Sequence, residues 1–145
     1  MFAPIWSSGR KRWAWLGLNL LTAFVASRVV GAFEGSIAQL AALAALMPIV
    51  ASIGGNTGNQ TAALVIRGLA LAQLDSRNLQ FLLRKELSIG LMNGTLWGAA
   101  MGACTLVLYG SLPLATVMAA AMLLNMLLGA LVGVLFPAAL HWRGR

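Results

Sequence analysis

The sequence predicts an all-α protein, a polytopic bundle of membrane helices with four spans, the second of them broken. Two observations carry this prediction. First, 60% of the 145 residues are hydrophobic, only 9% are charged, and the mean hydropathy is +0.86, whereas a soluble domain is about 45–50% apolar and about 25% charged. Second, apolar stretches close to the roughly 20 residues that a helix needs to cross a bilayer recur between short polar segments. The chain is therefore expected to lie in a lipid bilayer.

The elements follow in order along the chain. Residues 1–12 are expected to form a basic cytoplasmic arm, and residues 13–145 the transmembrane domain. Its expected spans are residues 13–33, 37–74, 87–108 and 114–140. A straight helix over residues 37–74 would measure about 57 Å, nearly twice the hydrocarbon thickness of about 30 Å. We therefore predict a break in this second span, at residues 54–60.

The charged residues predict the orientation. Ten Lys and Arg outnumber three Asp and Glu, and the basic residues cluster at the N-terminus, in the connection after the second span and at the C-terminus, all on the same side of the membrane. The positive-inside rule then places both termini in the cytoplasm and the chain in the inner (cytoplasmic) membrane. Glu34 is expected at the outer mouth, where it would attract cations. Asp75 and Glu86 are expected in the cytoplasmic connection, so no acid is expected at mid-membrane. Basic residues do not interleave with aromatics outside the apolar segments, so nucleic acid is not an expected partner.

Small and polar residues inside the spans predict helix packing. Glycines recur every fourth residue in the third span, which lets another helix backbone approach closely, either within the chain or in another subunit. Asn93 and Asn125 are expected to make interhelical hydrogen bonds. The single cysteine, Cys104, excludes an internal disulfide and is expected to be a packing residue. The glycines of the stripe are Gly90, Gly94, Gly98 and Gly102.

A polar run in the second span is the strongest candidate for a site. In lipid, irregular polar backbone survives only within protein or beside a water-filled cavity. Carboxamide and backbone oxygens suit hard cations, directly or through water. The run either lines an ion path or forms a broken-helix turn whose amides satisfy freed backbone groups. Continued as a helix, the run places Asn56 and Gln60 close to one face. The expected lining is Gly54, Gly55, Asn56, Thr57, Gly58, Asn59 and Gln60.

Signs of catalysis are missing from the sequence. It has no Ser/His/Asp grouping, no paired acids and no phosphate-binding loop. We therefore expect no enzyme and no organic cofactor.

These residues resemble the membrane domain of MgtE-type magnesium transporters. The most specific part is the run from Pro48 to Gln60, with its Gly-Gly-Asn-x-Gly-x-Gln pattern. The resemblance also covers Phe33-Glu34, Arg67-Gly68-Leu69-Ala70, Arg84-Lys85-Glu86 and the segment from Gly129 to Pro137.

The resemblance implies Mg²⁺ as the transported ion, a homodimer with the pore between subunits, and a second helix that lines this pore. By the same resemblance, Asn56, Asn59 and Gln60 are expected to bind the ion, through water. It also implies cytosolic regulatory domains and a fifth membrane helix with an acid at the ion site, and these 145 residues carry neither. We therefore expect channel-like passive uptake that is incomplete without a fifth helix, which a separate polypeptide could supply. The alternatives are a non-conducting membrane scaffold subunit and transport of another divalent cation such as Co²⁺ or Mn²⁺.

Overall fold

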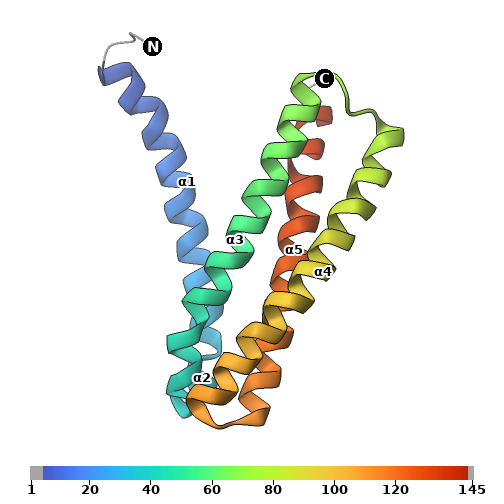
Figure 1. Ribbon diagram of the computed structural model, residues 1–145. Coiled ribbons are helices and arrows are strands. Elements are labelled where there is room, and N and C mark those ends of the chain that lie inside the picture. The colour runs from blue at the N-terminus through green and yellow to red at the C-terminus, as the bar shows by residue number, and fades with distance from the viewer. Residues whose placement is uncertain (1–4, 144–145) are drawn as a thin grey trace. The chain divides into compact units, whose positions relative to one another are not determined.

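The computed structural model describes residues 5–143, and within them the chain is helical with no strands (Figure 1). Four of its helices are long and apolar enough to cross a membrane, over Trp15–Ala32, Ala41–Ala70, Arg77–Tyr109 and Leu112–Arg143. The predicted fold class, an all-α membrane protein with four spans, is thereby confirmed. Residues 1–4 of the predicted basic arm and residues 144–145 lie outside the described residues.

The chain divides into two compact units, one up to Ala44 and one from Ala45 onward. The first unit contains α1 (Ile5–Ala32) and the short α2 (Glu34–Gln39). Phe33 separates them, and its carbonyl accepts the backbone N–H of Ser36 and of Ile37. The 28 residues of α1 give a length of about 42 Å, enough to cross the hydrocarbon layer. Trp13 and Trp15 are exposed near its start, as residues at a membrane interface are expected to be.

The second unit is a three-helix bundle made by α3 (Ala41–Ala70) from Ala45 onward, α4 (Ser76–Tyr109) and α5 (Leu112–Arg143). A two-residue turn joins α4 to α5, and Gly110 adopts a φ of 62° there, a conformation that glycine enters without a steric penalty. The turn makes α4 and α5 antiparallel neighbours (Figure 1).

Helix α5 supplies the core of this bundle. Its buried side chains recur every fourth residue, which places them on one stripe of the helix. Long methionines occupy the half of the stripe nearer the α4–α5 turn, and smaller residues occupy the other half. The stripe consists of Met118, Met122, Met126, Ala130, Val134 and Ala138.

The glycine stripe of α4 lies against α5. A Cβ built on Gly98 would sit 2.8 Å from the carbonyl oxygen of Ala119, and one on Gly102 would sit 3.2 Å from that of Ala115. Gly90 and Gly94 face α5 in the same way. The partner helix that the sequence left undecided is therefore within the same chain, and the close approach lets many weak dispersion contacts form.

The predicted break at residues 54–60 is not found, because α3 is helical without interruption from Ala41 to Ala70. The helical path is interrupted earlier, at Leu40, whose φ of −131° and ψ of 78° are not helical. Two glycines of the polar run, Gly54 and Gly58, serve packing instead. A Cβ on Gly129 of α5 would lie 2.8 Å from the Gly54 carbonyl oxygen, so α3 and α5 approach backbone to backbone. An intact helix also satisfies its own N–H and C=O groups in lipid.

Candidate cation site

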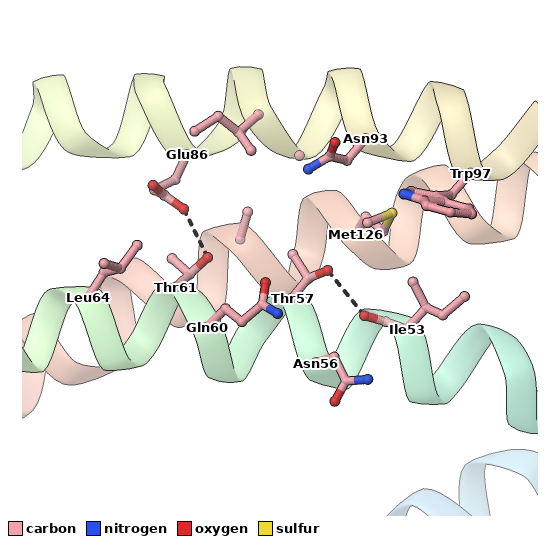
Figure 2. A pocket seen from close by; sticks show the side chains of 13 residues that line it. Ile53, Asn56, Thr57, Gln60, Thr61, Leu64, Glu86, Asn93, Trp97 and Met126 are labelled. Carbon is pink, nitrogen blue, oxygen red and sulfur yellow. Dashed lines mark hydrogen bonds between the residues drawn. The ribbon is translucent and has the colours of Figure 1, made fainter.

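A cavity with polar and apolar walls lies between α3 and α4 in the second unit. Its volume is about 510 Å³, and Met126 and Ala130 of α5 form its floor. Polar side chains lie between Leu64 at one end and Ile53 and Trp97 at the other, and Asn56 points away from α4 at the edge of the cavity (Figure 2). The polar lining residues are Asn56, Thr57, Gln60, Thr61, Glu86 and Asn93.

Helical periodicity explains how α3 presents this polar face. Residues three and four apart project from the same side of a helix, so Asn56 and Gln60 line the cavity together with Thr57 and Thr61. Thr57 Oγ1 donates a hydrogen bond to the carbonyl of Ile53 at 3.1 Å. Its proton is therefore used within α3, while its lone pairs stay available on the cavity side.

Glu86 is the one charged residue among those lining the cavity. Its position differs from the one that the sequence predicts. The expected position was a cytoplasmic connection, but α4 begins at Ser76, so Glu86 lies well inside a helix. It is only 7% exposed. Its carboxylate oxygen Oε2 accepts a hydrogen bond of 3.0 Å from Thr61 Oγ1 across the cavity (Figure 2). Glu86 therefore lies within α4 on the wall of the cavity, and not in the connection between helices.

A usable signal for Glu86 was present in the sequence. Counting from it by three or four residues gives Gly90, Asn93 and Trp97, and all four line the cavity from α4. The adjacent Arg84 and Lys85 are exposed, and their charges favour the prediction of a cytoplasmic connection. Periodicity was the better guide than local charge.

The other predicted residues fall into three groups. Gly54 and Gly58 pack against α5, where a Cβ on Gly54 would overlap the Asn125 side chain. Gly55 and Asn59 are exposed and do not line the cavity. Glu34 is exposed in the first turn of α2, in the first unit, and its role in attracting cations stays a prediction.

Two further asparagines were expected to link helices. Asn125 of α5 does so, because its Nδ2 donates a hydrogen bond of 2.6 Å to the Val50 carbonyl of α3. Asn93 is half-buried and lines the cavity instead. Among the residues whose side chains the structure describes, none forms a hydrogen bond with the Asn93 amide.

The lining has the chemistry of a site for a hydrated hard cation. It offers amide, hydroxyl and carboxylate oxygens, which such ions prefer as ligands. Across the described part of the chain, no three His, Cys, Asp or Glu side chains gather closely enough to hold a metal. A fully dehydrated ion in a dedicated cage is thus not what the side chains fit, whereas an ion that keeps several waters is.

Comparisons with known proteins agree with this chemistry. A family model described as MgtE, divalent cation transporter, matches residues 47–145, well over half of the chain. The magnesium transporter MgtE of Bacillus subtilis (strain 168) is 29% identical over 131 residues, which cover 90% of this chain and 29% of that protein. The protein of that name from Thermus thermophilus is 41% identical over 80 residues, which cover 55% of this chain and 18% of the relative.

A third magnesium transporter MgtE, from Enterococcus faecalis, is 28% identical over 127 residues, which cover 88% of this chain and 28% of the relative. The chain thus spans less than a third of the length of these relatives. The expectation of a transporter rather than an enzyme agrees with the family that the model describes. The chain belongs to the MgtE family of divalent cation transporters.

Proposed function

We propose that this chain takes part in the passive transport of Mg²⁺ across the cytoplasmic membrane, through the cavity between α3 and α4. The observation that carries the proposal is a cavity with six polar lining residues between helices long and apolar enough to span a bilayer. The relatives named as magnesium transporters support the choice of ion.

The chemistry of the lining suits Mg²⁺. This ion gives up its water reluctantly and is usually held with several waters in place. The amides of Asn56 and Gln60 can hydrogen-bond to those waters without stripping them. A membrane voltage of 100 mV supplies about 2.3 kcal/mol per charge, or about 4.6 kcal/mol for a divalent ion. Uptake therefore needs no chemical energy source.

The charges of the second unit predict its orientation in the membrane. Its basic residues gather at the end where α3 finishes, α4 begins and α5 finishes, while the turn at Gly110 and Ser111 is uncharged. The positive-inside rule assigns the basic end to the cytoplasm. Mg²⁺ would then move from the Trp97 end of the cavity toward the Glu86 end. The basic residues of this end are Arg67, Arg77, Arg84, Lys85 and Arg143.

The proposal includes a partner on the polar face of α3. Asn56 and Asn59 are both exposed, and an amide that faces lipid without a hydrogen-bond partner costs several kcal/mol. A second copy of the chain seated on this face would cover them, in agreement with the homodimer that the resemblance implies. A separate polypeptide that supplies a fifth helix is the alternative partner. Chemical cross-linking in native membranes separates the two.

Mg²⁺ uptake into liposomes that contain the purified chain tests the function. The Asn56→Ala/Gln60→Ala double variant removes both amides, and each hydrogen bond to a charged ion shell contributes roughly 1.5–3 kcal/mol. We expect the uptake rate to fall by at least about tenfold, since 1.4 kcal/mol is a factor of ten. Gln80→Ala is the matched control, because Gln80 is exposed and does not line the cavity.

The same assay ranks the alternatives. If Co²⁺ or Mn²⁺ is taken up at the same rate as Mg²⁺, the chain is a general divalent cation transporter, since oxygen ligands accept all three ions. No uptake from well-folded protein would refute autonomous transport. In that case a partner helix added in trans that restores uptake would indicate a divided pore, and failure to restore it would favour a scaffold subunit.

A further inference from the structure

Glu86 is held in an unusual position for an acid in a membrane protein. Counted back from Tyr109 at the opposite end of α4, it lies about 35 Å along the helix axis, close to the inner boundary of a hydrocarbon layer of about 30 Å. It is nevertheless buried, on the wall of the cavity. An acid at this depth that needed only water would be expected to point outward, as Arg84 and Lys85 beside it do.

The carboxylate has one hydrogen-bond donor and no cationic partner in the described structure. Thr61 Oγ1 donates to Oε2. Among the side chains described within residues 5–143, no Lys or Arg forms an ion pair with Glu86. A buried charge is costly unless it is paired or coordinates a metal. The carboxylate borders the cavity, so a counter-charge can approach it from there.

We propose that Glu86 is the charged ligand of a divalent-cation site at the inner end of the cavity, completed by oxygens of Thr61, Gln60 and Asn93. The inference rests on the proposed transport function for its physiological ion, but the site can be measured without transport. The hydroxyl of Thr61 positions the carboxylate, while the amide of Asn93 has no hydrogen bond to another described residue.

The size of the cavity fits an ion that keeps part of its water shell. Water occupies about 30 Å³ per molecule in the liquid, so a cavity of about 510 Å³ has room for an ion and its first shell. One carboxylate with neutral oxygens matches the usual way in which proteins hold Mg²⁺, through one or two carboxylates and several waters.

The location of the site indicates its role in the release of the ion toward the cytoplasm. Beyond Gln60, α3 continues for two turns to Arg67, about 10 Å further along the axis, and the other basic residues of this end follow. Their positive field opposes a cation that leaves the cavity toward the cytoplasm. The Glu86 carboxylate offsets that field at the last polar position before it, so an ion can dwell there before it leaves.

Mn²⁺ binding, followed by electron paramagnetic resonance on the purified chain in lipid nanodiscs, tests the site. Glu86→Gln keeps an acceptor for Thr61 but removes the charge, and we expect Mn²⁺ affinity to fall by about tenfold or more. Asp75→Asn is the charge-matched control, because Asp75 lies exposed in the connection at the same end of the bundle. It should bind as the parent chain does.

A second pair of variants guards against a folding defect. Thr61→Val removes the hydroxyl at the site, whereas Thr105→Val removes an equally buried hydroxyl that only donates to the Met101 carbonyl of its own helix. We expect Mn²⁺ affinity to fall in Thr61→Val alone. Unchanged affinity in Glu86→Gln, or an equal loss in Asp75→Asn, would overturn the site. If Glu86→Gln does not fold, equal binding by the two threonine variants would overturn it.

The binding experiment and the uptake experiment test the site and the transport function independently of each other. Mn²⁺ binding that depends on Glu86, in a chain that takes up no Mg²⁺, would support the site and refute autonomous transport. Uptake that depends on Asn56 and Gln60, with Mn²⁺ binding indifferent to Glu86, would support transport and refute the site.

Discussion

Replacing Gly133 by alanine tests how tightly packing and the cavity are coupled. A Cβ at this position would lie 2.8 Å from the Gly58 carbonyl oxygen and 2.8 Å from Thr61 Cβ. Favourable contacts between carbon atoms need about 3.5–4.0 Å. Both neighbours belong to the backbone or its first side-chain atom, so α3 itself must move. Thr61 is also the donor to Glu86, and its displacement would lengthen that hydrogen bond.

The expected magnitude comes from two opposing effects. Inserting a methyl group into a packed contact costs about 1–3 kcal/mol, while glycine to alanine within a helix gains up to about 1 kcal/mol in propensity. Gly55→Ala on α3 is the matched control, because nothing lies within 4 Å of a Cβ built there. It gains the propensity without the clash. The free energy of unfolding of Gly133→Ala should therefore be lower than that of Gly55→Ala by about 1–3 kcal/mol.

Reversible unfolding in mixed micelles, followed by circular dichroism, measures this difference. Equal stability of the two variants would refute the reasoning, since it would mean that α3 and α5 do not approach as closely as their glycines allow. Mn²⁺ binding on the same samples adds a functional readout, and it should weaken in Gly133→Ala only.

Two further predictions follow from single contacts and from the charge distribution. Asn125→Ala removes the hydrogen bond to the Val50 carbonyl and should lower the free energy of unfolding by about 1 kcal/mol, and unchanged stability would contradict this. In a Cys104→Ala background, Asn78→Cys should react with a membrane-impermeant maleimide only from the cytoplasmic side, and Ser111→Cys only from outside. Labelling of intact cells and of inside-out vesicles checks the orientation, and the reverse pattern would contradict it.

Much of the architecture was predictable because composition and periodicity act locally. A chain with so few charges must place its long apolar stretches in lipid, and each stretch then satisfies its own backbone by forming a helix. The placement of Asn56 and Gln60 on one face followed from the same periodicity. Pairing Gly90 with α5 rather than with another subunit needed three-dimensional information, because a small-residue stripe does not identify its partner.

The two errors have one physical origin. The low helix propensity of the glycines at positions 54–58 predicts a break, and the charges around Glu86 predict a cytoplasmic connection. In the bundle, close contact with α5 gives Gly54 and Gly58 a packing role inside an intact helix. Helix α4 extends past the hydrophobic segment and brings Glu86 to the cavity. Tertiary contacts override local propensity at both places.

The position of α5 in the core also determines the order in which the bundle assembles during synthesis. A polypeptide emerges from the ribosome with its N-terminal part first, so α3 and α4 enter the bilayer while α5 is still being synthesised. During that interval the glycine faces of both helices meet only lipid, and Met126 and Ala130 are not yet present beneath the polar residues. The cavity is therefore the last part of the bundle to take shape. A ribosome that stalls before α5 leaves α1, α3 and α4 inserted, with the polar cavity residues of α3 and α4 not yet covered by α5.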